Sequence, residues 1–512
     1  MFSDRLIPLI FSLDSILALL LGLLSYGILL AIYRLTLHPL AKFPGPKLAA
    51  ATRWYEFYHD VAPNKGCYLW KIEAMHARYG PIVRVTPDEL HIKDSSYFDE
   101  IYAPAGGRKR EKWAPQLVIL PASMNATASH EVHRMKRSAL ASFFSKQKVV
   151  KMEPLITGKI EHLAERLEAI VGTGEVVRLD ATYHALTTDI ISEYCFGESY
   201  IQLAEPDFAV VWKETLRIGA STQGFLRQFP FIAPWLKRIP GSVLAYLDEG
   251  AAMMATFTKN VANDARRAMA ENEAGKRSDG TLFQAMLDNA PPQVKTLDWL
   301  EDEAAAVVGA GGETTGKALA IATFHLLDDP AKLKKLRDEI ASVNLGPNGL
   351  PRLQDLESLP YLTGCCREGV RLMYGLTSRM GRVAPDEAMV YKQYTIPPNT
   401  PISQSTYFVH TDPAIFPDPH SFDPERWIKA EQGGINNDLM RFLVSFVRGP
   451  RICIGMNLAW AELYLTMAII LSRFDMELFE TDIDDVAVKY DFMLMSAKLD
   501  SKGVRAKVKN SI

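Results

Sequence analysis

The chain has 512 residues, a length that allows one large domain or two. Hydrophobic residues make up 48% of the sequence and charged residues 23%, which is the ordinary balance of a globular enzyme. The formal net charge is −3, which argues against nucleic acid as a main partner.

The first predicted element is a membrane-spanning helix at residues 15–33. No charged residue lies between Asp14 and Arg34, and a run of this length is sufficient to cross about 30 Å of hydrocarbon. Basic residues follow the run, so the positive-inside rule places its C-terminal side in the cytosol and residues 1–14 in the lumen. A cleaved signal peptide is the alternative, but it requires a basic start and a small-residue cleavage site.

Residues 34–47 are predicted to form a hinge, because the sequence FPGP within them is stiff and not helical. Residues 48–512 are then expected to form one domain that is mainly α with a minor β region. Hydrophobic periodicity predicts its long helices at 130–144, 153–171, 207–220, 248–272, 298–327, 361–374 and 456–474. Alternating residues predict a small hairpin within 81–92 and short strands within 387–396.

Five cysteines are scattered along the chain, and their spacing fits neither a disulfide framework nor a CxxC metal site. A reducing, cytosol-facing compartment is the simplest interpretation. Cys453 lies in FVRGPRICIG, two residues after Arg451 and just before the last predicted helix. An isolated cysteine is most often a buried, inert thiol. A helix N-terminus, however, lowers the pKa of a thiol, and Gly449 and Gly455 allow backbone to approach a flat ligand.

The pattern F-x-x-G-x-R-x-C-x-G resembles the haem-binding signature of the cytochrome P450 family at every fixed position. The resemblance implies that Cys453 is the axial ligand of the haem iron and that Arg451 contacts a haem propionate. It also implies that Gly449 and Gly455 provide clearance and that Phe446 packs near the sulfur.

Two further stretches resemble motifs of the same family. Glu368-Gly369-Val370-Arg371 resembles its E-x-x-R motif, although this spacing alone is common in surface ion pairs. The sequence FDPERW at 422–427 resembles its F-x-P-E-R-W segment. The resemblance implies that Arg426 joins Glu368 and Arg371 in a buried triad that stabilises the core near the cysteine loop.

The sequence AGGETT at 310–315 lies inside a predicted long helix, where each glycine costs about 1 kcal/mol relative to alanine. A close contact between helices is one explanation for such glycines. The stretch also resembles the family motif A/G-G-x-D/E-T-T/S. That resemblance implies a local opening for dioxygen, a proton supply through Glu313 and a Thr314 hydroxyl that holds the reacting oxygen.

Basic residues at 133–137 read as a solvated helix face when taken alone. In the family, a W-x-x-x-R stretch at this place contacts the haem propionates. Arg137 matches the arginine, and His133 replaces the tryptophan while keeping the ability to donate a hydrogen bond. Arg382 matches another propionate-binding arginine, with Gly381 in place of the usual proline.

The resemblance covers nearly the whole chain and implies a cytochrome P450 fold preceded by a single transmembrane helix. It implies a monooxygenase that carries haem b, consumes dioxygen and lies in the endoplasmic reticulum membrane with its catalytic domain in the cytosol. No G-x-G-x-x-G follows a predicted strand, so electrons are expected from NADPH through a separate reductase, with cytochrome b5 as a second donor.

The expected substrate is a hydrophobic small molecule, because the stretches that line the pocket by family position are mainly apolar. These stretches are 102–120, 200–245, 307–308, 374–377 and 492–495. The sequence HPLAKFPGPKLAAATRWYEFYHD resembles fungal enzymes of specialised metabolism, including trichodiene-oxygenase-like ones. A terpenoid is therefore the first expectation, and a polyketide or indole alkaloid is the next. A haem-thiolate isomerase or dehydratase without external electrons is the alternative, and a non-catalytic haem carrier is another.

Overall fold

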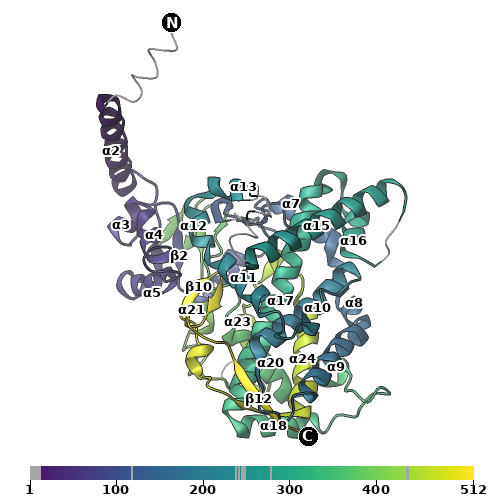
Figure 1. Ribbon diagram of the computed structural model, residues 1–512. Helices are drawn as coiled ribbons and strands as arrows, with labels where there is room; N and C mark the ends of the chain where they lie inside the picture. The colour runs from purple at the N-terminus through teal and green to yellow at the C-terminus, as the bar shows by residue number, and fades with distance from the viewer. Residues whose placement is uncertain are drawn as a thin grey trace.

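The computed structural model describes residues 13–116, 119–236, 239, 243, 249–276, 280–433 and 438–512. The predicted lumenal segment 1–14 therefore lies almost wholly outside the described residues. The described chain forms a helix-rich body with small sheets, and one helix, α2 (Leu13–Thr36), projects away from it (Figure 1). A mainly helical fold with a minor β region is confirmed.

Helix α2 extends beyond the predicted span of 15–33 at both ends. Its segment Asp14–Thr36 has a mean hydropathy of 2.4, and none of its most apolar window is buried in the protein. The helix is therefore long and apolar enough to cross a membrane. A signal sequence near an N-terminus has the same length and composition.

The segment after α2 is fixed to the body. Arg84 donates from Nη1 to the carbonyl oxygen of Arg34 at 2.8 Å, and its backbone N–H donates to Pro44 at 2.7 Å. Leu40 and Phe43 are buried in a small hydrophobic cluster. Residues 34–36 of the predicted hinge at 34–47 thus belong to α2, and the rest of it packs on the domain.

The remaining helices, in chain order, are α3 (Lys47–Ala51), α4 (Trp54–Asp60), α5 (Tyr68–Tyr79), α6 (Phe98–Tyr102), α7 (His130–Ala141), α8 (Lys146–Lys151), α9 (Glu153–Glu168), α10 (Leu179–Phe196), α11 (Val210–Ser221), α12 (Gln223–Gln228), α13 (Ala233–Leu236), α15 (Glu249–Glu273), α16 (Leu282–Asn289), α17 (Leu297–Asp328), α18 (Pro330–Ile340), α19 (Leu353–Leu356), α20 (Pro360–Leu372), α21 (Thr406–His410), α22 (Glu425–Glu431), α23 (Leu439–Phe442) and α24 (Met456–Arg473). Each predicted long helix is confirmed, with ends that shift by a few residues.

The strands of the described residues belong to four small sheets. The largest has the order β1-β2-β8-β5-β3, formed by β1 (Ile82–Arg84), β2 (Leu90–Ile92), β8 (Ile402–Ser403), β5 (Arg382–Val383) and β3 (Glu111–Lys112). A second contains β4 (Val176–Arg178), β12 (Arg505–Ser511) and β9 (Phe474–Leu478), and two hairpins pair β6 (Met389–Tyr391) with β7 (Tyr394–Ile396) and β10 (Tyr490–Phe492) with β11 (Leu494–Ser496). The strands predicted within 81–92 and 387–396 are confirmed.

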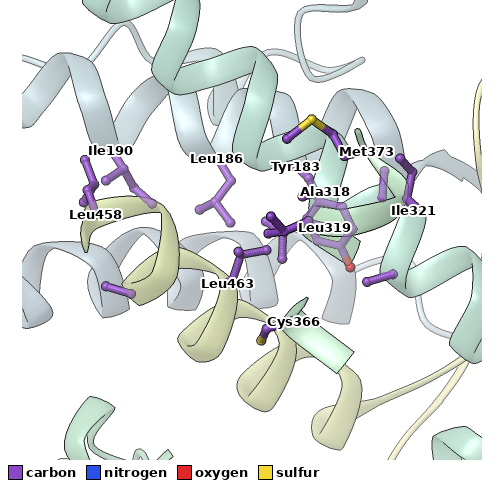
Figure 2. Packing of buried hydrophobic residues seen from close by; sticks show 14 of the residues in the cluster. Tyr183, Leu186, Ile190, Ala318, Leu319, Ile321, Cys366, Met373, Leu458 and Leu463 are labelled. Atoms are coloured by element: carbon purple, nitrogen blue, oxygen red, sulfur yellow. The ribbon is translucent and has the colours of Figure 1, made fainter. Parts of the chain in front are cut away.

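Four helices, α10, α17, α20 and α24, form the centre of the core. Figure 2 shows side chains of all four meeting at one place, among them Leu186, Leu319, Cys366 and Leu463. Helix α10 is buried almost all the way round, which explains why its sequence carries no amphipathic pattern. This bundle positions both the Ala-Gly-Gly stretch of α17 and the cysteine loop that precedes α24.

Candidate active site

Residues 446–455 form a compact loop that ends at the first turn of α24. The backbone N–H of Cys453 donates to the carbonyl oxygen of Phe446 at 2.9 Å, which closes the loop on itself. Arg137 of α7 donates from Nη1 to the Ile452 carbonyl at 2.6 Å. The Phe446 ring packs against Trp460 of α24, with the ring centroids 5.4 Å apart. Helices α7 and α24 therefore hold the loop from two sides.

Cys453 differs from the other four cysteines, all of which lie in the described part of the chain. It is exposed, whereas Cys195, Cys365 and Cys366 are buried and Cys67 is partly buried. Although its side chain has a free side, the surrounding protein desolvates the sulfur and raises the pKa of the thiol; an N–H group of Gly455 and the charge of Arg137 lower it. The N–H group ahead of α24 thus lowers the pKa of Cys453, as its position before a helix predicts, but burial outweighs this effect and the net direction is upward.

Positively charged side chains gather near this thiol, and the charge of Glu111 acts on one of them, Arg451. Within the described part of the chain, Arg137, Arg382 and Arg451 form no ion pair with a carboxylate, and Nε of Arg451 is buried without a hydrogen-bond partner. Burial lowers the pKa of Arg382 to about 10, and burial with the charge of Arg382 lowers that of Arg451 to about 9. Burial and these same cations lower the pKa of His133 to about 2.

These features fit haem. Its iron would supply the positive charge that favours the thiolate of Cys453, since a metal deprotonates a coordinating thiol. Its two propionates would neutralise the guanidinium groups of Arg137, Arg382 and Arg451, of which Arg382 is buried and the other two are partly buried. Within the described residues, no group of three His, Cys, Asp or Glu side chains is placed to hold a metal ion.

The two glycines of the loop have different surroundings. Gly449 has a φ of +71°, and a Cβ there would lie 2.5 Å from the Tyr102 carbonyl oxygen and 2.6 Å from Cα of Ala103. The close contact with α6 and with Ala103 thus explains why glycine is required at position 449. Nothing lies within 4 Å of the place of a Cβ at Gly455, so space for a flat ligand remains beside this residue.

The structure brings Glu368, Arg371 and Arg426 together. Arg371 makes two contacts of 2.7 Å with the Glu368 carboxylate, and Nε of Arg426 lies 3.5 Å from Oε1 of Glu368. Trp427 and the backbone N–H of Asp423 complete the carboxylate shell at 2.9 Å each. Arg371 also donates to three carbonyl oxygens, those of His410, Pro419 and Ser421. The cluster therefore fastens α20 to the chain that leads to α22.

This cluster continues toward the cysteine loop. The Ser445 hydroxyl donates to the Val370 carbonyl at 2.7 Å, and the Val444 N–H donates to Nε2 of His410 at 3.0 Å. Both residues immediately precede Phe446. The position of the cysteine loop is thus set by α20 and α21 as well as by α7 and α24.

The glycines of α17 serve a close contact between helices. A Cβ at Gly312 would lie 2.3 Å from Oγ1 of Thr188, and one at Gly311 would lie 2.8 Å from Cγ1 of Ile191. Thr187 donates from its hydroxyl to the Gly312 carbonyl at 2.7 Å. Helix α17 runs without interruption through this stretch. The glycines therefore allow α10 to approach, and this packing accounts for them without a helix opening.

Glu313 and Thr314 follow these glycines in α17. Oε1 of Glu313 lies 3.0 Å from Nζ of Lys317, and its Oε2 lies 3.6 Å from Nε2 of His184. Burial raises the pKa of Glu313, but Lys317, His184 and Lys213 outweigh it and the net direction is downward. The Thr314 hydroxyl donates to the Ala310 carbonyl at 2.8 Å, the ordinary bond of a threonine to the preceding turn.

Three residues near this site were not found from the sequence: Lys112, His184 and Lys317. Lys112 of β3 adds a cation near Arg382 and Arg451. Burial is the largest cause that lowers the pKa of Lys112, and the charges of Arg382 and Arg451 lower it further. His184 and Lys317 are the partners of Glu313. The i, i+4 spacing of Glu313 and Lys317 was the one available signal.

A helical fold with an exposed cysteine beside clustered arginines fits a haem-thiolate protein. The cytochrome P450 family model matches residues 61–501 of the chain. Conidiogenone synthase PchP450 of Penicillium rubens is 43% identical over 491 residues, which cover 95% of this chain and 98% of that protein. The chain therefore belongs to the cytochrome P450 family, uses haem and is a monooxygenase.

Further relatives are also fungal. Cytochrome P450 monooxygenase TRI4 of Trichoderma arundinaceum is 41% identical over 459 residues, which cover 89% of this chain and 88% of that protein. Tryptophan 6-hydroxylase fscE of Fusarium equiseti is 36% identical over 484 residues, which cover 94% of each chain. These relatives place the chain among monooxygenases that oxidise intermediates of fungal secondary metabolism.

Proposed function

We propose that the protein is a membrane-anchored monooxygenase that hydroxylates or otherwise oxidises a terpenoid intermediate. The observation that carries the chemistry is the exposed Cys453 thiol near Arg137, Arg382 and Arg451, which form no ion pair with a carboxylate of the described residues. Haem bound there by a thiolate supplies activation of dioxygen, since thiolate donation favours O–O cleavage. The proposed haem contacts and the proposed proton delivery come from side chains of this chain.

The residues near the haem have distinct proposed roles. Cys453 is the axial ligand, and Arg137, Arg382, Arg451 and His133 bind the propionates. The Phe446 side chain is proposed to pack near the sulfur, and its backbone carbonyl oxygen accepts the N–H of Cys453. Gly455 leaves space for the haem, whereas Gly449 allows the cysteine loop to pack closely against Tyr102 and Ala103. Glu368, Arg371 and Arg426 hold the core around the loop and take no chemical part.

Glu313 and Thr314 are the proposed proton-delivery pair. Glu313 takes up a proton from solvent, passes it inward and becomes ionised again. The Thr314 hydroxyl orients the reacting oxygen. The Thr314 hydroxyl must give up its bond to the Ala310 carbonyl to do so, which an exposed hydroxyl can do by rotation about one bond.

The substrate proposal rests on likeness to relatives. The resemblance to trichodiene-oxygenase-like enzymes favours a terpenoid, and the likeness to TRI4 supports that choice. An indole compound is the second candidate, because another relative is named tryptophan 6-hydroxylase. A polyketide is the third. Of the stretches expected to line the pocket, residues 117–118, 237–238, 240–242 and 244–245 lie outside the described part of the chain.

Membrane attachment and the redox partner complete the proposal. Helix α2 is the proposed single-pass anchor of the endoplasmic reticulum membrane, with residues 48–512 in the cytosol. Large apolar side chains are exposed beside it, among them Leu48, Trp54, Phe231 and Trp235. In Figure 1 the helices that carry or adjoin them, α3, α4, α12 and α13, lie at the end of the body nearest α2. Electrons come from an NADPH-dependent reductase, with cytochrome b5 as a second donor.

The test is production of an oxidised compound by the full-length chain with a fungal reductase. Farnesyl-derived hydrocarbons, tryptophan and aromatic polyketides are supplied in parallel, and product must depend on NADPH and dioxygen. When isotopically labelled dioxygen is supplied, a labelled oxygen atom must appear in the product. Turnover without NADPH or dioxygen would instead show an isomerase or dehydratase.

A spectroscopic arm tests the ligand assignment. The reduced holoprotein with carbon monoxide should show the strongly red-shifted Soret band of thiolate ligation, and Cys453→Ser should abolish it. Cys67→Ser, a change at a partly buried cysteine, is the matched control and should keep the band. Retention of the band in Cys453→Ser would overturn the assignment.

A further inference from the structure

Lys317 connects the proposed proton donor to a distant hairpin. Its Nζ lies 3.0 Å from Oε1 of Glu313, one helical turn earlier in α17. The same Nζ donates at 2.8 Å to the carbonyl oxygen of Met495 in β11. One ammonium group therefore contacts both the carboxylate and the hairpin β10–β11, which lies far along the chain.

The hairpin belongs to the stretches proposed to line the substrate space. Leu494 forms an isolated bridge with Leu376, and the Thr377 N–H donates to the Met493 carbonyl at 2.9 Å. Both of these contacts join 374–377 to 492–495. A substrate that displaces either stretch would move the Met495 carbonyl, and that movement would act on Lys317.

We propose that Lys317 is a positioning residue that couples the β10–β11 hairpin to Glu313 and so restrains proton delivery until the hairpin moves. With the hairpin in place, Lys317 holds the Glu313 carboxylate as an ion pair. When the Met495 carbonyl shifts, the ammonium group follows it, and Glu313 is free to take up a solvent proton and pass it toward Thr314. This inference rests on the proposed role of Glu313.

The electrostatics of the pair give the sign of the effect. Charged and titratable groups face Glu313 from three helices: Lys317 on α17, His184 on α10 and Lys213 on α11. Lys213 is itself paired with Asp180 at 2.8 Å, which weakens its effect on Glu313. Lys317 makes the largest contribution that lowers the pKa of Glu313. Its removal would raise that pKa and leave more of the acid protonated at neutral pH.

The first experiment uses the full-length holoprotein with NADPH–cytochrome P450 reductase in phosphatidylcholine vesicles, without substrate. NADPH oxidation and hydrogen peroxide release are measured from about pH 6 to about pH 9. In Lys317→Met, the alkaline limb of the plot of NADPH oxidation rate against pH should move to higher pH by about one unit. At a given pH on that limb, the rate should therefore rise by up to about tenfold. Lys317→Arg should keep the wild-type profile.

The matched control is Lys334→Met, because Lys334 also forms an i, i+4 ion pair, with Asp338, on the exposed surface of α18. It should leave the profile unchanged. If Lys317→Met also leaves the profile unchanged while Glu313→Gln alters it, the inference is overturned and the proposed role of Glu313 stands. If Glu313→Gln has no effect either, the proposed role itself fails.

A second measurement does not depend on turnover. Hydrogen–deuterium exchange of the peptide that contains 490–496 should be faster in Lys317→Met than in the wild type, because the hairpin loses its bond to α17. Lys334→Met should leave this exchange unchanged. Unchanged hairpin exchange in Lys317→Met, with the carbon monoxide band intact, would overturn the coupling. Should Lys317→Met fail to bind haem, Lys317→Gln is the second variant, with the same expectation.

Discussion

Glu368 and Arg371 face each other across one turn of α20 through two contacts of 2.7 Å, and neither side chain is exposed to solvent. A surface pair with this spacing contributes little, because water screens it. Here the charges cannot be solvated if they are separated. Loss of either partner leaves the other buried and unpaired, at a cost of about 3–5 kcal/mol.

Glu368→Gln should therefore lower the free energy of unfolding by about 3–5 kcal/mol and reduce the fraction of protein that carries haem. Urea unfolding and the carbon monoxide spectrum per mole of protein measure the two effects. Asp355→Asn is the control, since Asp355 pairs with Arg352 at the same spacing on the surface. Equal effects in the two variants would contradict the structural role of Glu368.

Gly312→Ala should destabilise the protein, because the new methyl group would lie 2.3 Å from the Thr188 hydroxyl and force α10 away from α17. The expected loss is about 1–3 kcal/mol in urea unfolding. Gly309→Ala, in the same helix with nothing within 4 Å, should instead stabilise by up to about 1 kcal/mol. The double variant with Thr188→Ala should recover part of the loss. A neutral Gly312→Ala would show that the contact is not needed.

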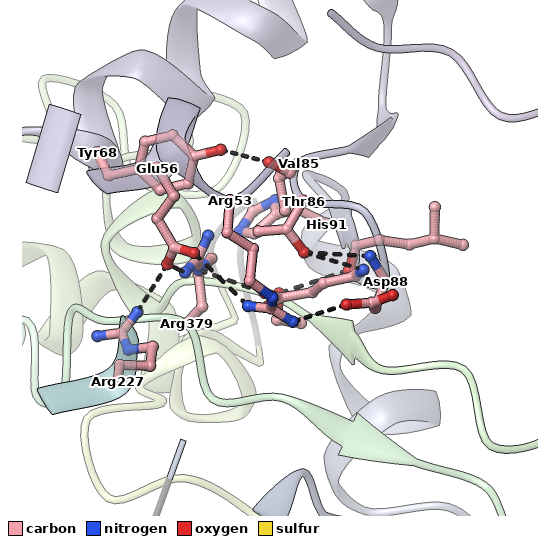
Figure 3. Close-up of polar contacts among 12 residues, drawn as sticks. Arg53, Glu56, Tyr68, Val85, Thr86, Asp88, His91, Arg227 and Arg379 are labelled. Atoms are coloured by element: carbon pink, nitrogen blue, oxygen red, sulfur yellow. Dashed lines mark hydrogen bonds and ion pairs between the residues drawn. The ribbon is translucent and has the colours of Figure 1, made fainter. Parts of the chain in front are cut away.

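Glu56 is buried among Arg53, Arg227 and Arg379, as Figure 3 shows, and Gln228 donates to it at 3.0 Å. Burial raises the pKa of Glu56, but the three arginines lower it to about 2. A carboxyl group with a depressed pKa contributes stability above its ordinary pKa of 4.5 and loses that contribution as pH falls through about 2.

Glu56→Gln should accordingly cost about 3 kcal/mol at neutral pH and less near pH 2. Denaturant unfolding across the acid range measures the difference. Glu480→Gln, at an exposed pair with Arg505, should change stability by less than about 1 kcal/mol at any pH. A Glu56→Gln penalty that stays constant down to pH 2 would contradict the assigned ionisation.

The apolar surface beside α2 should bind lipid by itself. Trp54 lies 6.2 Å from Phe229, and Phe229 lies 6.2 Å from Phe231, measured between ring centroids, so α4 and the segment before α13 form one aromatic surface. A chain that begins at residue 37, and that still gives the carbon monoxide band, should keep measurable binding to phosphatidylcholine vesicles.

Phe231→Ser combined with Trp235→Ser should weaken that binding by tenfold or more, at about 25 cal/mol for each Å² of apolar surface withdrawn from lipid. Co-sedimentation with vesicles measures it. The control combines Leu345→Ser with Ile483→Ser, since both side chains are as exposed but belong to other loops. Equal binding of the three chains would contradict a role for Phe231 and Trp235. Loss of all binding from the chain that begins at residue 37 would show that α2 is the point of attachment.

Much of this fold was accessible from sequence because its signals are local. Helix α24 follows a Gly-containing loop and α17 carries an N-terminal Thr296 cap, so their extents could be predicted closely. Helix α10 was missed as a separate element. Because neighbouring helices cover nearly all its faces, its sequence lacks the polar stripe on which periodicity depends.

The residues of the site likewise divide into those that local sequence predicts and those that depend on contacts between helices. Cys453 and Glu368 lie in motifs of fixed spacing, and their surroundings follow from the loop and helix that carry them. His184 could not be associated with Glu313, because that contact depends on how closely two helices approach. The role of Gly312 depends on the same approach, and the single sequence left helix contact and helix opening as alternatives. Contacts between distant elements leave no trace in one sequence.

The contact of Gly449 with Tyr102 and Ala103 has a consequence for how this enzyme can diversify. The segment that begins at Tyr102 is proposed to line the substrate space, so selection for a new substrate would act on it. Its first two residues also support the backbone of the cysteine loop. Variation that alters substrate choice is therefore expected to accumulate after Ala103, while these two positions stay nearly constant among descendants with different products.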